Sequence, residues 1–377
     1  MAGAGRCDLL IPTQVHRRYR QGAGLKVGAM SIMVVGGAGY IGAHVVRLLA
    51  DRGDDVVVVD DLSTGVGERV GDATLVELEV AGESAQERLE LLMKERAVTA
   101  VIHFAAKKQV GESVERPTWY FRQNVGGLVN LLAAMENTGV GTMIFSSSAA
   151  VYGNPDVDIV TEDTGASPIN AYGETKLVGE WLMADCARAW GLRWSALRYF
   201  NVAGAGWPEL GDPAVLNLVP MVLDRLAKGE RPKIFGDDYE TPDGTCIRDY
   251  IHVLDLAHAH LAALDHLGGG ETSDAGEHVF NVGTGTGASV REVIEEIGRA
   301  TGMDVSPDVE PRRPGDPPRL VASPDRITEA LGWKAEHGLS DIIRSAWEAW
   351  QAGPRRIERV AGTSARAGAD QAGPVDT

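Results

Sequence analysis

Residues 31–42 read SIMVVGGAGYIG, and this stretch decides the fold class. Its first five residues, Ser31–Val35, are mainly apolar, which predicts a buried strand. The glycines that follow fit the pattern G-x-G-x-x-G at the start of a helix, and they occupy positions 36, 37, 39 and 42. Because glycine has no Cβ, such a turn can be tight and can approach a pyrophosphate at the positive end of the helix. The stretch therefore predicts a βαβ unit that binds a dinucleotide.

Short strand-like runs alternate with longer helical patterns through the first half of the chain. Alternation of this kind is typical of a parallel sheet with helices on both faces. From Asn201 onward, loops rich in Gly, Pro and Asp interrupt the pattern. We expect an α/β protein: a Rossmann-type doubly wound parallel sheet with a smaller mixed α/β C-terminal substrate lobe. The expected strands are Ser31–Val35, Val56–Asp60, Val101–Ala105, Thr142–Ser146 and Arg193–Arg198, and the expected helices are Ile41–Arg52, Pro117–Thr138 and Tyr172–Trp190.

The same pattern divides the chain into domains. Residues 30–200 are expected to form the dinucleotide-binding domain, and residues 201–353 mainly the substrate lobe. Within that lobe, residues 278–300 return to the first domain through a strand at His278–Val282. Residues 1–29 show no periodic apolar pattern, and residues 354–377 have few large apolar groups, so both segments are expected to be disordered. Met30 directly precedes the first strand, so translation that begins there is one expectation, beside translation from Met1.

Composition excludes several classes of protein. The 377 residues carry a formal net charge of -17, which repels nucleic acid and anionic membranes. No run approaches the 18 apolar residues of a membrane span, and the N-terminus lacks the pattern of a signal peptide. The three cysteines, Cys7, Cys186 and Cys246, have no metal-ligand spacing and suit a reducing compartment. We expect a cytoplasmic protein that binds neither nucleic acid nor membrane and has no metal site.

An acidic residue at the end of the second strand indicates which dinucleotide binds. Asp60 lies about 20 residues beyond the glycines, where a carboxylate can accept hydrogen bonds from the adenosine ribose hydroxyls. A 2′-phosphate at that position would meet two carboxylates, Asp60 and Asp61, with no arginine directly after them. The sequence therefore favours NAD as the cofactor.

Tyr172 and Lys176 form the candidate catalytic pair in AYGETK, downstream of three serines at 146–148. On a helix, residues i and i+4 share a face with Cβ atoms about 5–6 Å apart. A tyrosine with a pKa of about 10 is a poor base at neutral pH. An ammonium at about 5 Å favours the phenolate by roughly 3 kcal/mol at an effective dielectric near 20. We expect Lys176, together with the positive ring of an oxidised nicotinamide, to lower the pKa of Tyr172.

With these motifs in order, the chain resembles the extended short-chain dehydrogenases/reductases, and within them the UDP-glucose 4-epimerase family. The likeness runs from about Ser31 to Gln351. One segment that carries the likeness is IFGDDYETPDGTCIRDYIHVLDLA, and its block from Phe235 to Ala257 is particularly specific to the epimerases. The other segments that carry it are GGAGYIG, HFAAKKQVGESVERP, NVGG, SSSAAVYG, YGETK, LRYFNVAGA, NVGTG and RRPGD.

This resemblance implies an isomerase of galactose metabolism that interconverts UDP-glucose and UDP-galactose, with NAD taking and returning the hydride through a 4-keto sugar. Ser148, Tyr172 and Lys176 would be catalytic. The implied cofactor contacts are Gly36, Gly39, Tyr40, Ile41, Gly42, Asp60, Asp61, Glu79, Val80, Phe104, Ala105, Lys108, Asn124, Tyr172 and Lys176. The implied substrate contacts are Ser148, Tyr172, Asn201, Asn217, Leu218, Phe235, Arg248, Arg313 and Asp316.

Several points stay open at this level. Val35 replaces a threonine usual before the glycine turn, and Glu79 replaces an aspartate. Leu320 stands where the family has a residue whose size controls admission of N-acetylated sugars. Ala149 and Ala150 replace the Asp-Glu pair of a dehydratase, which argues against loss of water. The alternatives are a C4 epimerase of another UDP-sugar, namely an N-acetylhexosamine, a uronate or a pentose, or a non-catalytic dinucleotide sensor.

Two further expectations concern assembly and the histidines. By analogy with the family, the helices Pro117–Thr138 and Tyr172–Trp190 are expected to pair across a two-fold axis in a homodimer. His252, His258 and His260 have no set of metal-ligand partners in the sequence, so we interpret them as structural.

Overall fold

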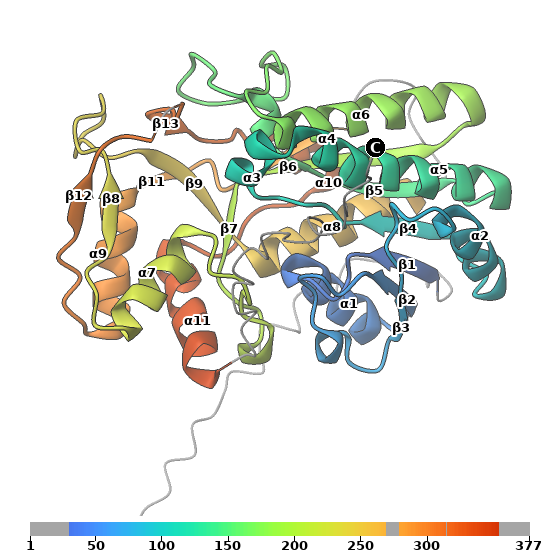
Figure 1. Cartoon of the computed structure of the whole chain (residues 1–377), viewed down its shortest axis with the longest axis horizontal. Coiled ribbons are helices and arrows are strands. Elements are labelled where there is room, and N and C mark those ends of the chain that lie inside the picture. Colours follow the sequence, from blue (N-terminus) through green and yellow to red (C-terminus); the bar gives the residue numbers. More distant parts are fainter. Residues whose placement is uncertain (1–29, 269–278, 314, 354–377) are drawn as a thin grey trace, which may run out of the picture.

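Seven parallel strands form the central sheet, in the spatial order β10-β6-β5-β4-β1-β2-β3 (Figure 1). The structure, a computed structural model, describes residues 30–268, 279–313 and 315–353. The terminal segments expected to be disordered, and His278 of the expected return strand, lie outside these residues. The strands of the sheet are β1 (Ser31–Val35), β2 (Asp55–Asp60), β3 (Thr74–Glu77), β4 (Ala100–His103), β5 (Thr142–Ser148), β6 (Arg193–Tyr199) and β10 (Val279–Val282).

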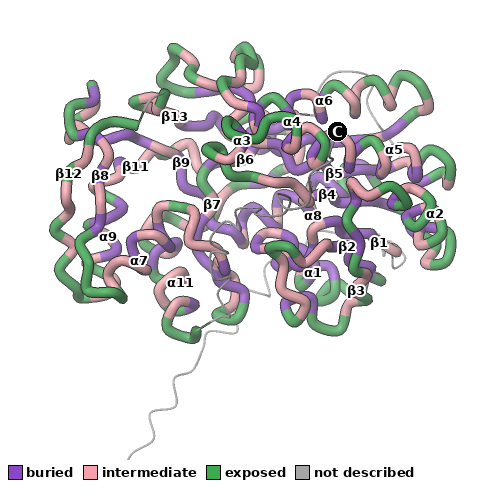
Figure 2. The backbone as a smooth tube through the Cα atoms, viewed as in Figure 1, coloured by how far each residue is buried: buried purple, intermediate pink, exposed green. Residues whose placement is uncertain are grey.

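Helices cover both faces of this sheet. Because both faces are covered, Val56–Val59 of strand β2 are all buried, and polar and apolar residues do not alternate along this strand. One face packs against α1 (Tyr40–Arg52), α8 (Val253–Gly268) and α10 (Asp325–Leu331). The other packs against α2 (Ala85–Glu95), α5 (Gly127–Thr138) and α6 (Ala171–Trp190). The buried residues accordingly follow the strands and the inner sides of these helices (Figure 2).

The second lobe is built from short strands. Strand β9 (Ile247–His252) pairs with β7 (Asn201–Ala203), β11 (Gly287–Ser289) and β13 (Arg319–Leu320), while β8 (Lys233–Phe235) pairs with β12 (Asp308–Glu310). A separate apolar cluster holds α7 (Leu218–Ala227), α9 (Val290–Thr301) and α11 (Leu339–Ala352) together. The remaining elements are α3 (Val110–Glu115), α4 (Pro117–Tyr120), the π-helical turn η4 (Phe121–Gly126) and the 3₁₀ turns η3 (Gly67–Val70), η5 (Ala149–Tyr152) and η6 (Pro208–Leu210).

The lobes are more interleaved than the expected domain boundaries imply. Helix α8 falls within 201–353 but packs on α1, because its apolar residues spread over more than one side and need the large sheet to cover them. Within 278–300, only β10 joins the large sheet. Strand β11 pairs with β9, and α9 packs in the second lobe. The return to the first domain is therefore confined to β10 in this segment.

The expected helix Pro117–Thr138 is not a single α-helix. A π-helical turn at Phe121–Gly126 separates α4 from α5. The wider turn places Asn124 against the loop after β4, where its Oδ1 accepts from the backbone N–H of Lys107 at 2.8 Å. Its Nδ2 donates to the carbonyl of Lys107 and to Thr175 Oγ1, both at 3.0 Å. Such bulges recur at functional sites, and this one ties the loop to α6.

The expected fold class is confirmed. Apart from the divided helix Pro117–Thr138, the strands and helices expected in the first half of the chain agree with the structure to within a few residues at each end. No helix in the described part of the chain is long and apolar enough to cross a membrane.

Candidate active site

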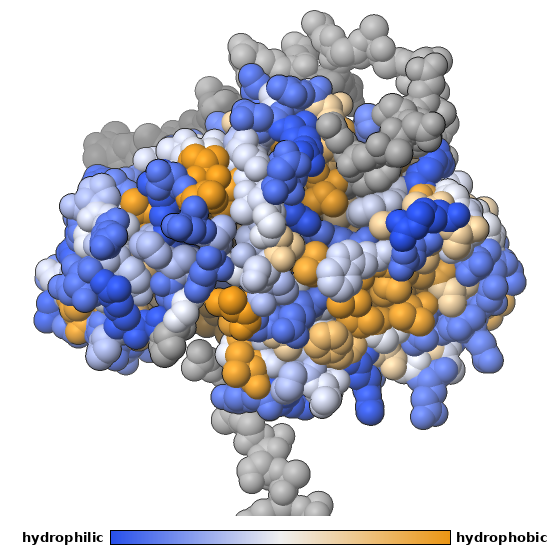
Figure 3. Space-filling model, turned by 90° about the horizontal axis from the view of Figure 1, so that it is seen from above, coloured by the Kyte–Doolittle hydropathy of each residue, from blue (hydrophilic) through white to orange (hydrophobic). Residues whose placement is uncertain are grey.

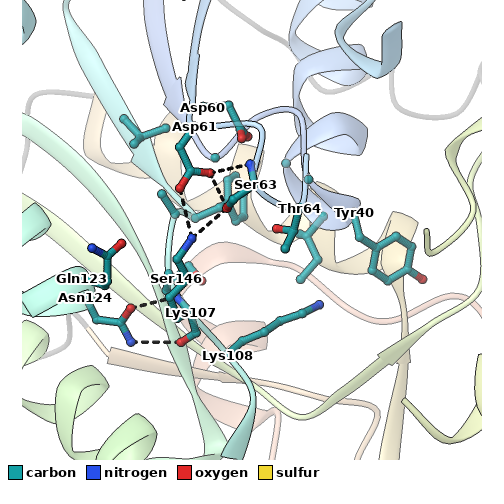
Figure 4. A pocket seen from close by; sticks show the side chains of 18 of the residues that line it. Tyr40, Asp60, Asp61, Ser63, Thr64, Lys107, Lys108, Gln123, Asn124 and Ser146 are labelled. Atoms are coloured by element: carbon teal, nitrogen blue, oxygen red, sulfur yellow. Dashed lines mark hydrogen bonds and ion pairs between the residues drawn. The ribbon is translucent and has the colours of Figure 1, made fainter. Parts of the chain in front are cut away.

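The glycine turn opens a cavity at the carboxyl ends of β1, β2, β4 and β5, which we call the first cavity (Figure 4). Two glycines are required by close approach. Gly36 has φ of 83°, and a Cβ there would lie 2.6 Å from the backbone N of Ala105. A Cβ on Gly42 would lie 2.3 Å from the carbonyl O of Gly36. The turn thus brings the N-terminus of α1 to the cavity with bare backbone, a cradle that suits a pyrophosphate.

All residues with implied cofactor contacts line the first cavity. Tyr40 differs from its neighbours in the direction of its hydroxyl, which donates to the carbonyl of Gly204 at 2.5 Å and ties the glycine turn to the second lobe. The nearby cavity residues Ser63, Lys107 and Gln123 were missed by sequence reasoning. Lys107 meets Asp61 and Ser63, and Gln123 meets Glu79, across segments that lie far apart in the sequence, and no local pattern marks them.

Two aspartates stand at the end of β2. Asp60 is buried, its Oδ2 accepts from the backbone N–H of Ala38 at 3.0 Å, and its Oδ1 accepts from that of Leu62 at 2.9 Å. Burial raises the pKa of Asp60, against the lowering effect of these bonds. For Asp61, burial acts to raise the pKa, but hydrogen bonds from Ser63 and the ammonium of Lys107 outweigh it and lower the pKa. The residues present fit NAD: each Asp60 oxygen keeps a free lone pair for a ribose hydroxyl, and a 2′-phosphate would face both carboxylates.

The candidate catalytic pair is placed by β5 and α6. The Asn170 side chain caps α6 by accepting from the backbone N–H of Gly173 at 2.9 Å, so Tyr172 falls in the first turn. Lys176 is buried, and its Nζ donates to the carbonyl of Ser146 at 2.7 Å and lies 5.9 Å from the ring centroid of Tyr172. Ser148 lines neither cavity, and its Oγ accepts from the backbone N–H of Ala150 at 3.2 Å.

The expected low pKa of Tyr172 is wrong for the protein chain alone. Burial raises the pKa of Tyr172, and a hydrogen bond with Ser148 acts to lower it. A fully charged Lys176 would favour the phenolate, but burial lowers the pKa of Lys176 to about 7. In this enclosed position the desolvation of both charged forms outweighs their attraction. Another positive charge is therefore needed to favour the phenolate, and the oxidised nicotinamide of NAD would supply one.

A second cavity, of about 700 Å³, adjoins the first. Lys108, Gln109 and Leu216 line both. The residues with implied substrate contacts that line this second cavity are Asn201, Asn217, Leu218, Phe235, Arg248, Arg313 and Asp316. Tyr172 lines the first cavity instead. The structure thus brings the implied nucleotide-sugar residues of the second lobe together in a cavity that adjoins the one lined by Tyr172 and Lys176.

Arginines and an aromatic ring dominate the polar end of the second cavity. Arg248 Nη2 pairs with Asp316 Oδ1, and its Nη1 donates to the carbonyl of Ile247 at 2.8 Å. The guanidinium carbon of Arg313 stands 4.0 Å from the ring centroid of Phe235. Guanidinium groups keep their charge and match phosphate oxygens in bidentate fashion. This end of the cavity is suited to a diphosphate beside a flat ring.

The three histidines lie apart from both cavities, and the described residues contain no group of His, Cys, Asp and Glu side chains that could hold a metal ion. His252 Nε2 lies 2.9 Å from Ser345 Oγ, and the Nδ1 of His260 donates to the carbonyl of Leu256 at 2.8 Å. Burial lowers the pKa of both imidazoles to about 4. These two side chains are therefore neutral packing groups.

Comparisons with known proteins agree with this geometry. Residues 32–283 match the model of the NAD dependent epimerase/dehydratase family. The chain is 45% identical to a UDP-glucose 4-epimerase of Corynebacterium glutamicum, over 84% of this chain and 95% of that protein. It is 46% identical to one of Azospirillum brasilense, over 84% and 91%.

Two solved structures are similar across nearly their whole length. The UDP-glucose 4-epimerase of Brucella ovis in complex with NAD superposes with a TM-score of 0.79 at 47% identity, covering 84% of this chain and 97% of that chain. The enzyme of Bifidobacterium longum in complex with NAD+ and UDP superposes with a TM-score of 0.79 at 37% identity, covering 87% and 100%.

Proposed function

The chain belongs to the NAD dependent epimerase/dehydratase family, and from this premise we propose that it interconverts UDP-glucose and UDP-galactose by inversion at C4. The observation that carries the proposal is the junction of the two cavities. Tyr172 and Lys176 line the cavity that fits NAD, and Arg248, Arg313 and Asp316 line the adjoining one. A sugar held by its UDP in the second cavity would extend toward the tyrosine.

In this proposal Tyr172 takes the proton from the C4 hydroxyl, and Ser148 shares that hydrogen bond. Bound NAD supplies the acceptor, and later the donor, of the C4 hydride. Lys176 supports the phenolate from its fixed position on the carbonyl of Ser146. The glycine turn, Asp60 and Asn124 would hold the dinucleotide.

Inversion also requires the oxidised sugar to present its other face. Binding free energy must therefore act on the nucleotide rather than on the hexose. The residue types fit this division, because Arg248 and Arg313 carry guanidinium groups that suit a diphosphate, whereas Ala149 and Ala150 line the second cavity directly after Ser148. These alanines cannot serve as the acid and base that a dehydration needs.

The proposal includes a homodimer in the cytoplasm. Helices α5 and α6 lie side by side on the large lobe and expose Val129 and Trp181, which are 47% and 59% accessible. Apolar side chains also gather on the face that carries α6 (Figure 3). Pairing of two copies through these helices would cover them. Cys186 and Cys246 are free thiols, which suits a reducing compartment.

The test is to incubate the purified protein with UDP-galactose, without added cofactor, and to quantify UDP-glucose by chromatography. Conversion together with NAD in an acid extract of the protein supports the proposal. Parallel initial rates with UDP-N-acetylglucosamine, a UDP-uronate and a UDP-pentose compare the substrates. No conversion of UDP-galactose by protein that contains NAD would contradict the proposed activity.

A further inference from the structure

The ammonium of Lys107 bridges the adenosine side of the first cavity. Its Nζ donates to Asp61 Oδ2 at 3.0 Å and to Ser63 Oγ at 2.7 Å (Figure 4). Lys107 follows β4, whereas Asp61 and Ser63 follow β2, and β1 lies between these two strands in the sheet. The link therefore crosses the carboxyl edge of β1, from which the glycine turn leaves.

Both ends of this bridge are fixed by further hydrogen bonds. Asn124 binds the backbone N–H and the carbonyl of Lys107, as described above. On the opposite side, Asp61 Oδ1 accepts from the backbone N–H of Ser63 at 2.9 Å and from its hydroxyl at 2.6 Å. The ammonium also lies 6.0 Å from the ring centroid of Trp119. Only the aliphatic stem of Lys107 has to move for the bridge to open.

The bridge stands between two hollows. The first cavity lies on one side, and a surface hollow of about 470 Å³ lies on the other. Asp61, Ser63 and Lys107 line both of them. Gln123 and Glu79, also shared, form a second link, with Gln123 Nε2 donating to Glu79 Oε1 at 2.8 Å. Together these side chains form a partition, and opening it would join the adenosine side of the first cavity to the surface.

We propose that the Lys107–Asp61 pair is a latch that controls how fast the dinucleotide leaves the protein. This inference rests on the NAD site of the proposed function, and it assigns a retention role to a lysine that is not the one aligned with the family's cofactor contact, Lys108. The side chains of the pair are 20% and 29% exposed, so water and salt reach it. Salt screens the part of this pair that water reaches, although less than it would screen a fully exposed pair. The latch is therefore salt-sensitive.

The test measures release of NAD from the purified holoprotein after dilution, by assaying NAD in protein-free filtrates over time. Lys107→Leu is expected to release NAD about threefold to tenfold faster than the unmodified protein at low salt, because a partly exposed ion pair contributes modestly. The two rates should converge at about 1 M salt, where the screening length is about 3 Å. Lys107→Arg keeps the charge and should keep release slow.

Two controls separate a latch from a general effect of charge. Lys228 lies directly after α7, and its Nζ is 2.7 Å from Oδ2 of Asp224 at the surface. Lys228→Leu removes this ion pair and should leave the rate of NAD release unchanged. In a cycle with Asp61→Asn, the double variant should release NAD no faster than the faster single variant, since either change opens the same bridge. The melting temperature of each variant, compared with that of the unmodified protein, shows whether the variant is folded.

Release from Lys107→Leu at the rate of the unmodified protein would overturn the latch, and so would a salt-independent difference. Either result can occur in a protein that converts UDP-galactose, so failure of the latch and failure of the proposed function are distinguishable. Protein that neither holds NAD nor turns over UDP-galactose contradicts the function itself.

Discussion

Glu180 follows Lys176 by one turn of α6, and both side chains are buried, each about 4% exposed. The carboxylate is held on two sides. Its Oε1 accepts from Ser147 Oγ at 2.5 Å and from Arg198 Nε at 2.8 Å, and its Oε2 accepts from Arg198 Nη2 at 2.5 Å. Burial lowers the pKa of Lys176, and the charge of Glu180 acts to raise it. A fixed negative charge thus stands one helical turn from the ammonium that we propose supports Tyr172.

Replacement of Glu180 by Gln should narrow the pH range of activity. The amide oxygen can still accept from Ser147 and Arg198, but the negative charge is gone, so the pKa of Lys176 falls further below its ordinary value. The ammonium is then lost at lower pH, and the alkaline limb of the kcat profile should move to lower pH. Glu174→Gln, at an exposed position of the same helix, is the matched control. A lower melting temperature with an unchanged pH profile would show that Glu180 has a structural role only.

Tyr172→Phe should reduce kcat by about 10²–10⁴-fold, the usual contribution of a general acid–base group. The hydroxyl is removed while the ring still fills its place, so the variant should retain NAD. Turnover of UDP-galactose and the NAD content of the purified variant are the two measurements. Activity close to that of the unmodified protein would exclude Tyr172 as the base, whatever the NAD content.

Gly42→Ala should remove NAD from the purified protein. The new Cβ would stand 2.3 Å from the carbonyl O of Gly36 and 2.8 Å from Cα of Gly37, so backbone must shift at the turn that cradles the pyrophosphate. Overpacking of this kind destabilises by about 1–3 kcal/mol. Gly141→Ala is the control, because its Cβ would meet nothing within 4 Å. Full NAD content in Gly42→Ala would show that the turn does not contact the cofactor closely.

His337 should contribute stability that depends on pH. Its Nδ1 lies 2.7 Å from Asp255 Oδ1, and this hydrogen bond raises the pKa of His337. The folded pKa exceeds the ordinary value of about 6.5, so the contribution is complete below that pH and is lost as pH rises through the folded pKa. His337→Gln should therefore lower the melting temperature more at pH about 5.5 than at pH about 9. Exposed His266→Gln is the control, and an equal effect at both pH values would contradict the ion pair.

Leu320→Ala should widen the substrate range. Leu320 pairs in register with Arg248 between β13 and β9, it packs against the apolar cluster that contains Ala149, and it lines the second cavity. A shorter side chain leaves room for an acetamido group. The ratio of kcat/KM for UDP-N-acetylglucosamine to that for UDP-glucose should rise about tenfold, within the range that such pocket changes produce. An unchanged ratio would place the size filter elsewhere.

The sequence predicted the first domain well because its signals are local. Consecutive valines mark β2, and the glycines after Val35 mark the turn into α1. The π-helical turn at Phe121–Gly126 was not predictable, since its residues are compatible with an ordinary helix. The strands of the second lobe could not be predicted from the sequence, because β7, β8 and β11 have three residues each, which is too few to show a periodic pattern of apolar residues.

The residues of the candidate site also fall into a group that the sequence predicted and a group that it did not. The glycines, Asp60 and the Tyr172–Lys176 pair stand in recognisable motifs, and the structure gathers them in the first cavity. The Lys107–Asp61 and Glu180–Arg198 pairs join residues far apart in sequence, which no motif links. The direction in which the pKa of Tyr172 is shifted depends on burial, and the spacing of residues on a helix does not reveal burial.

Strand β10 has a consequence for the order in which the protein folds during synthesis. It closes the edge of the large sheet beside β6, and Phe280 and Val282 are fully buried in the core of the first lobe. Strands β7, β8 and β9 and helix α7 of the second lobe precede β10 in the chain, so a nascent polypeptide that has just completed β6 still has an unpaired, apolar sheet edge. A fragment cut after residue 200 would keep that edge open to other chains. The nucleotide-binding lobe is therefore not a separable module, and its last strand arrives only after the ribosome has made β7, β8 and β9.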